Sequence, residues 1–257
     1  MKLRQACTRT ILLISLMLCA WAASARAQQA SPPALDPTAD KIFAGTCQVL
    51  ESANAFSFHA DVMYDQVLPS AVKVQYSGAM DYLVQRPGDL AIVYRSDLGG
   101  KDLWYGNSSL TLFDPKYNVY ATIEVPPTID AMLDEVAAKQ DLRMPLSDLA
   151  YSNPCQRPKK IAVYSGYLGV NNVNGVPCDH LAFSSAADDF QVWIDHAGKP
   201  LPRKVVINHR SIPGSPEYIA FISNWKFPKD IPASRFQPQV PKDAKQIEFV
   251  KVEEPKP

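Results

Sequence analysis

The feature that most constrains this chain is a two-residue alternation of apolar and polar side chains that starts at residue 55. Phe56 and Phe58 alternate with Ser57 and other polar residues over 55–64, and the same period returns over 72–84. Successive side chains of a β-strand point to opposite faces, so this period predicts two long strands with one apolar face each. A sheet that buries that face is therefore the expected framework.

Short turn-forming pairs separate the strands that follow. The joins are Pro87-Gly88, Gly99-Gly100, Gly106-Asn107 and Asp114-Pro115. Connections this short favour antiparallel hairpins, because parallel strands need a long crossover. We therefore expect antiparallel strands near residues 90–94, 101–105, 110–113 and 117–125, and later near 161–170, 176–183, 190–195, 202–208 and 217–225.

Helical signals precede the strand pattern and interrupt it once. Asp36 can cap a helix that has Pro37 at its first position and ends near residue 54. Thr128 can cap a second helix through about residue 140, and a short helix is expected over 146–151. The predicted fold class is α+β, with a curled antiparallel sheet around the helices in one domain over residues 36–248.

The ends of the chain have a different composition. Residues 1–27 read as a signal peptide, with a basic start, a short apolar stretch and a small-x-small pattern that predicts cleavage after Ala27. Cys19 follows Leu18, which fits a lipoprotein signal poorly. A flexible leader over 28–35 and a charged tail over 249–257 are also expected.

Charge and hydropathy exclude several function classes. Removing the signal peptide takes away four of the 26 basic residues and none of the 26 acidic ones, which leaves a net charge of −4. Nucleic-acid binding needs clustered basic residues, so we expect no nucleic-acid partner. No segment is long and apolar enough to predict a membrane span, so an integral membrane protein is not expected.

Three cysteines follow the leader, and an oxidising compartment favours one disulfide and one free thiol. Cys47 lies in an apolar helical pattern, which favours an unpaired buried side chain. Cys155 and Cys178 both lie beside turn signals, so we expect these two to be bonded. Closing their 23-residue separation would stabilise the fold by about 3 kcal/mol.

Motifs for catalysis, metals or cofactors are not found. The histidines at 59, 180, 196 and 209 form no HxH or HExxH pair, and GxSxG and glycine-rich phosphate loops do not occur. The acidic pair Asp188-Asp189 is typical of a solvated turn. We therefore expect no enzyme, no metal and no cofactor, with a hydrolase kept as the third hypothesis.

Apolar side chains on the hairpin strands are the strongest candidates for a binding site. We expect Trp104, Phe113 and Tyr120 to belong to the core or to the lining of a ligand cavity, because they lie on apolar stretches of neighbouring strands. A curled sheet with bulky apolar residues on its concave face can bind an apolar ligand. The same pattern is also compatible with a filled core.

Five segments in order resemble the LolA/LolB-like lipoprotein carriers of the bacterial periplasm. They cover residues 55–61, 78–87, 105–115, 190–198 and 236–241. Residues 113–115, 126–130, 145–149 and 175–183 further resemble a family of predicted periplasmic proteins of unknown function related to those carriers.

This resemblance implies an incomplete β-barrel with a helical lid, a periplasmic location and an apolar cavity. In the carriers, an arginine at the position of Arg86 lies near the cavity and bonds to the lid, so the resemblance makes Arg86 a candidate for the same role here. The alternative is that Arg86 is a surface cation beside a turn. The resemblance favours a non-enzymatic binding or carrier protein for a lipid or other apolar ligand. The alternative is an envelope sensor or scaffold that binds a protein partner.

Overall fold

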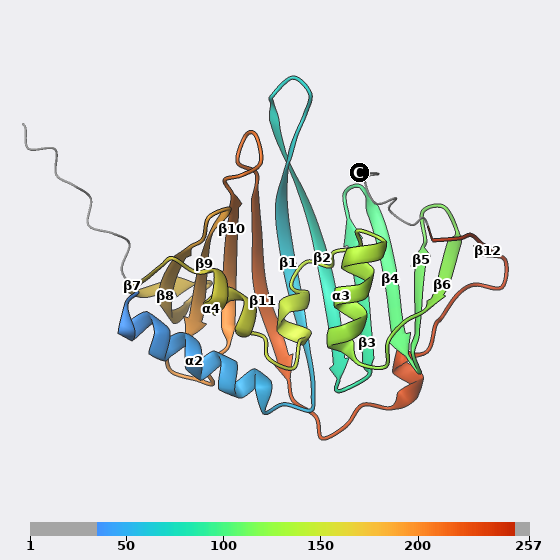
Figure 1. Cartoon of the computed structure of the whole chain (residues 1–257), viewed down its shortest axis with the longest axis horizontal. Helices are drawn as coiled ribbons and strands as arrows, with labels where there is room; N and C mark the ends of the chain where they lie inside the picture. The colour runs from blue at the N-terminus through green and yellow to red at the C-terminus, as the bar shows by residue number, and fades with distance from the viewer. Residues whose placement is uncertain (1–34, 250–257) are drawn as a thin grey trace, which may run out of the picture. The chain divides into compact units, whose positions relative to one another are not determined.

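A twelve-stranded sheet forms the body of the structure, a computed structural model that describes residues 35–249 (Figure 1). The signal peptide, and nearly all of the leader and tail, lie outside the described residues. The strands are β1 (Ala55–Val67), β2 (Lys73–Gln85), β3 (Asp89–Ser96), β4 (Gly99–Gly106), β5 (Ser109–Asp114), β6 (Val119–Glu124), β7 (Tyr164–Val173), β8 (Val176–Ser184), β9 (Asp188–Asp195), β10 (Pro202–His209), β11 (Glu217–Lys226) and β12 (Lys245–Gln246).

Two antiparallel meanders make up this sheet. Its strand order is β12-β6-β5-β4-β3-β2-β1-β11-β10-β9-β8-β7, so the meanders β1–β6 and β7–β11 join where β1 pairs with β11. Only the two-residue β12 is parallel to its neighbour, β6. The edge strands β12 and β7 are not paired with each other, which leaves the curled sheet open. The predicted α+β class with an incomplete barrel is confirmed.

The helices begin where their capping residues predict. The side chain of Asp36 accepts a hydrogen bond from the Thr38 amide at the start of α2 (Pro37–Glu51), and Thr128 caps α3 (Ile129–Lys139) in the same way. The short η1 (Ser147–Ala150) also lies where a helix is expected. Two further helical turns, α4 (Gln156–Ile161) and η2 (Ala233–Phe236), were not predicted.

Apolar side chains are buried on both faces of the sheet, and different segments of the chain pack against the two faces. Leu103 and Tyr105 of β4 point to the face where α3 and η1 complete the largest apolar cluster. Trp104, between them, points to the other face and packs with Ile231 and Phe236 from the C-terminal segment. A third cluster forms where α2 packs on β7, β8 and β9. Strand alternation thus separates a helix-covered face from one covered by the chain after β11.

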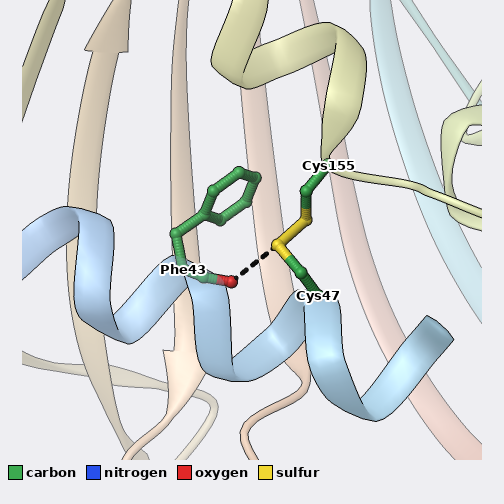
Figure 2. Close-up of a disulfide and its surroundings, with 3 residues drawn as sticks. All are labelled: Phe43, Cys47 and Cys155. Carbon is green, nitrogen blue, oxygen red and sulfur yellow. Dashed lines mark hydrogen bonds between the residues drawn. A yellow bond between two sulfur atoms is a disulfide. The ribbon is translucent and has the colours of Figure 1, made fainter. Parts of the chain in front are cut away.

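The disulfide joins Cys47 and Cys155, so the predicted Cys155–Cys178 pairing is wrong. Cys47 lies in α2 and Cys155 directly precedes α4, with their Cα atoms 5.7 Å apart (Figure 2). The carbonyl oxygen of Phe43 lies 2.9 Å from the Cys47 sulfur. Because a disulfide sulfur carries no hydrogen, this is a sulfur–oxygen contact.

The third cysteine, Cys178, is a free and fully buried thiol within β8. It is paired in register with Asn171 of β7 and Asp195 of β9, inside the hydrogen-bonded ladder. Turn signals beside a cysteine describe only the local chain, whereas the bond depends on which segments pack together. The packing of the α4 turn against α2 brings together residues 108 positions apart, a loop that the chain-entropy account values at about 4.7 kcal/mol.

Candidate functional site

A cavity of about 280 Å³ lies between the helix-covered face of the sheet and a roof made by α2, η1 and α4. Its floor comes from β9 and β10, in the second meander. The lining side chains are mostly apolar, and they are Phe43, Leu50, Leu146, Leu149, Pro154, Pro158, Ile161, Phe190, Val192, Pro202, Val205 and Ile207, with the disulfide at Cys155 and the polar residues Thr46, Asp148, Arg157, Asp188, Gln191 and His209.

The floor is a ladder of cross-strand pairs that changes from apolar to polar along the strands. Val192 lies opposite Val205, and Phe190 lies opposite Ile207. The next pair in the same row is Asp188 with His209, whose Nδ1 and the Asp188 Oδ1 are 2.8 Å apart. Since neighbouring side chains on one face of a pair touch, this row forms a continuous apolar surface that ends in a polar pair.

The roof is held together covalently. The Cys47–Cys155 bond fixes the start of α4 against α2, and Cys155 itself lines the cavity (Figure 2). From α2, Phe43 and Leu50 also face the cavity, as does Thr46 between them in sequence. Residues three and four apart share one face of a helix, so this stripe follows from the helical period.

A second polar group lies at the rim of the cavity. Arg157 Nη1 lies 4.0 Å from Asp148 Oδ1, and both side chains are largely exposed to solvent. Protein surrounding the rim partly desolvates Asp148, which raises the pKa of its carboxyl group, while the positive charge of Arg157 lowers it. The cavity therefore combines apolar walls with polar groups at particular points, as binding sites for small molecules do.

Arg86 lies outside this lining and bonds to the roof from the β2–β3 turn. Its Nη1 donates to the carbonyl oxygens of Leu50 and Ala53, at 2.6 and 2.7 Å. Its Nε donates to Ala150 O at 3.3 Å, and its Nη2 donates to Tyr151 O. The guanidinium thereby joins the end of α2 to the end of η1, where helix carbonyls have no partner within the helix.

The surroundings of Arg86 are partly apolar. Its guanidinium carbon lies 5.2 Å from the centroid of the Phe56 ring. Burial lowers the pKa of Arg86, and the negative charges of Asp130 and Glu51 act in the opposite direction. An arginine stays charged even so, because its ordinary pKa is far above neutrality. Arg86 is therefore a positively charged connection between two parts of the roof.

The three aromatic candidates lie on the other face of the sheet. Trp104 and Phe113 are 7% and 6% exposed and belong to the cluster under the C-terminal segment, against which Tyr120 is partly buried. None of the three is among the residues that line the cavity. They are core residues of the face that the C-terminal segment covers, whereas the cavity lies in the second meander.

Sequence reasoning did not single out the apolar floor residues, although a signal was present. It assigned Asp188 to a solvated turn, whereas Asp188 lies in β9 and lines the cavity. Phe190 and Val192 alternate with Asp189 and Gln191, but the alternation is lost at Trp193, and many strands of the chain show a similar pattern. Within residues 35–249, no group of three or more histidine, cysteine or acidic side chains is placed to hold a metal ion. In the same part of the chain, no helix is both long and apolar enough to cross a membrane.

Comparison with solved structures finds several that are similar to this chain at low sequence identity. LprF from Mycobacterium bovis has 13% identity and a TM-score of 0.48, over 79% of this chain and 98% of that one. The lipoprotein LppX from Mycobacterium tuberculosis has 11% identity and a TM-score of 0.43, over 76% and 98%. The LolA superfamily protein NE2245 from Nitrosomonas europaea has 12% identity and a TM-score of 0.39, over 78% and 97%. These likenesses concern the course of the chain alone.

No curated protein matches this sequence significantly. A family model does match, and it extends from residue 39 to residue 250, which is nearly all of the described structure. The matched region includes all but the first two residues of α2, every strand of the sheet, and η1 and α4 of the roof. The chain belongs to the family described as predicted periplasmic protein (DUF2092).

Proposed function

We propose that this protein binds a lipid or another apolar ligand in the cavity between β9, β10 and the helical roof, as a non-enzymatic carrier of the periplasm. The observation that carries the proposal is the cavity itself, whose floor and roof are both mainly apolar. Water is a poor occupant of an apolar space of this kind, because it would lose hydrogen bonds there.

The size of the cavity limits the ligand. The volume of about 280 Å³ lies just below the usual range for ligand pockets, which runs from roughly 300 to 1,000 Å³. It suits one short alkyl chain or one ring system. Each methylene transferred from water into such a site contributes about 0.8 kcal/mol, before the cost of association is subtracted. A ligand with several acyl chains would need the roof to move.

Binding of a fluorescent apolar probe tests the proposal. The purified protein should enhance the fluorescence of N-phenylnaphthylamine, and Ile207→Phe, which fills the floor of the cavity, should weaken binding at least tenfold. Val93→Phe is the matched control, because Val93 is exposed on β3 and is not among the lining residues.

Circular dichroism would establish that both variants fold. Equal probe binding by parent, Ile207→Phe and Val93→Phe would contradict the cavity as the binding site. A folded parent protein that binds no apolar probe would instead favour the alternative, an envelope sensor or scaffold with a protein partner.

We also propose that the chain is exported and cleaved after Ala27, so that the mature protein starts at Gln28. The basic start, the apolar stretch and the small residues at 25 and 27 support this. The intact mass of protein recovered from the periplasm tests it, and a mass that includes any of residues 1–27 would contradict it.

A further inference from the structure

The turn α4 and the two residues after it form an exposed segment that is both basic and apolar. No residue of α4 is buried. Arg157, Lys159 and Lys160 are exposed, with 69% of the Arg157 side chain accessible to solvent. Ile161 and Val163 are also exposed, at 42% and 51%. We call residues 157–163 the basic–apolar segment.

The charge of this part of the roof is opposite to that of the mature chain. Residues 142–163 contain four basic residues and one acidic residue, a net charge of +3, whereas residues 28–257 carry −4. The acidic residue, Asp148, lies 4.0 Å from Arg157. Neither Lys159 nor Lys160 takes part in an ion pair with any residue in the range 35–249. Both lysines are therefore available to an anionic surface, to which each would add attraction.

Exposed apolar side chains beside cations are typical of segments that bind a membrane surface. The cations attract anionic headgroups, and the apolar side chains enter the boundary between the headgroups and the acyl chains. A single exposed apolar residue needs no explanation. Here, however, Ile161 and Val163 follow the three cations almost directly in the chain. The combination favours a lipid surface over a purely acidic partner, which would use the cations alone.

The same segment borders the cavity. Arg157, Pro158 and Ile161 are among the lining residues. The disulfide at Cys155 fixes the beginning of α4 against α2, so the segment has a defined place beside the cavity (Figures 1 and 2). Water dissolves apolar molecules poorly, so a carrier benefits from a cavity that lies next to the membrane that supplies or receives its ligand.

We propose that the basic–apolar segment docks the protein onto an anionic phospholipid surface, beside which the cavity takes up or releases its apolar ligand. This inference rests on the proposed function for the choice of a membrane as partner, and it adds the surface at which the ligand is exchanged. The docking is peripheral and reversible, because three cations and two apolar side chains make a far smaller contact than a spanning helix.

Co-sedimentation with lipid vesicles tests the inference. The purified protein should bind vesicles of phosphatidylcholine with about 30% phosphatidylglycerol at least about tenfold more tightly than vesicles of phosphatidylcholine alone. Replacing Lys159 and Lys160 together by glutamine should weaken binding to the anionic vesicles roughly 25-fold, since each base near such a surface contributes about a factor of five. Val163→Ser should weaken it at least about twofold, because an apolar contact is lost.

A second double variant is the matched control for charge. Lys226→Gln with Lys229→Gln removes two exposed lysines of β11 and the loop after it, outside the basic–apolar segment. It should change vesicle binding by less than about twofold, because salt screens charges that lie away from the docked surface. Circular dichroism would establish that every variant folds.

Binding of N-phenylnaphthylamine in the absence of vesicles separates this inference from the proposed function. Lys159, Lys160 and Val163 do not line the cavity, so their variants should bind the probe as the parent does. Equal binding to both kinds of vesicle, equal losses in the two double variants, or no sedimentation of the parent with anionic vesicles would overturn the docking surface while probe binding stands. Failure of the folded parent to bind the probe would overturn the proposed function itself.

Discussion

Replacing Arg86 by leucine should loosen the roof of the cavity without unfolding the sheet. Arg86 donates to carbonyl oxygens at the ends of both α2 and η1, and leucine can make none of these bonds. The contacts at the end of α2 are those to the carbonyl oxygens of Leu50 and Ala53, at 2.6 and 2.7 Å. The contacts to η1 tie the lid segment, residues 129–161, to the same guanidinium.

The expected rise in the open fraction of the lid follows from the bonds between Arg86 and the lid segment alone. A hydrogen bond to a charged group contributes about 1.5–3 kcal/mol, so the loss of even one equivalent bond to Ala150 or Tyr151 favours the open lid by that amount. Since 1.4 kcal/mol is a factor of ten, the open fraction should rise roughly 10- to 150-fold. Arg86→Lys should recover only part of this, because lysine lacks the planar fork that reaches both helix ends.

Hydrogen exchange of the lid amides measures this directly, because their exchange rates report the population of locally open states. In Arg86→Leu, the amides of α3 and η1 should exchange at least tenfold faster, while the core strands β1 and β2 change less. Arg143→Leu is the matched control, since Arg143 is an exposed arginine of the same lid segment, paired only with the exposed Asp141.

Unchanged exchange in a folded Arg86→Leu protein, indistinguishable from Arg143→Leu, would make Arg86 an ordinary surface residue. Equally faster exchange across the whole sheet would also contradict the account, because it would assign Arg86 to global stability instead of to the roof.

Three further predictions concern the disulfide, the sheet face under the C-terminal segment, and pH. Cys47→Ala should lower the unfolding free energy by about 2–5 kcal/mol in denaturant titrations, and a loss below about 0.5 kcal/mol would show that the bond to Cys155 does not form. Phe113→Ala should cost about 3–5 kcal/mol in the same assay, because Phe113 is buried under the C-terminal segment; a surface-like effect would refute its placement. The hydrogen bond from His59 to Asp81, at 2.8 Å, raises the pKa of His59. Its stabilisation is therefore complete below the unfolded value of about 6.5 and is lost as pH rises through the folded pKa. NMR titration should find that Asp81→Asn lowers the His59 pKa, and no change would contradict the pair.

Local chemistry made much of this fold predictable. The caps at Asp36 and Thr128 each satisfy an amide at a helix start, and the two-residue period reports which strand faces are buried. By contrast, α4 was missed because its six residues include Pro158 and no apolar stripe. This turn packs over the cavity and is joined to α2 through the disulfide at Cys155, and neither contact can be seen in the local sequence.

The site depends on contacts that no local pattern encodes. The pairing of β1 with β11 sets the second meander beside the first, and it thereby decides which apolar strand face meets α2. Cys47 had every local feature of a buried, unpaired side chain, yet its partner lies 108 residues away. Trp104 and Phe113 were recognised as apolar strand residues, but their facing depends on the C-terminal segment that covers them.

Photo-cross-linking with a single-chain alkyl probe that carries a diazirine tests the central claim most directly. Peptide mapping of the labelled protein should find the modifications on the floor and roof of the cavity, in residues 186–209 and 142–161, and an excess of unlabelled 1-octanol should suppress them. Labelling that remains under competition, or that gathers on exposed apolar side chains such as Leu168 and Val170 of the β7 edge, would contradict a ligand site in this cavity.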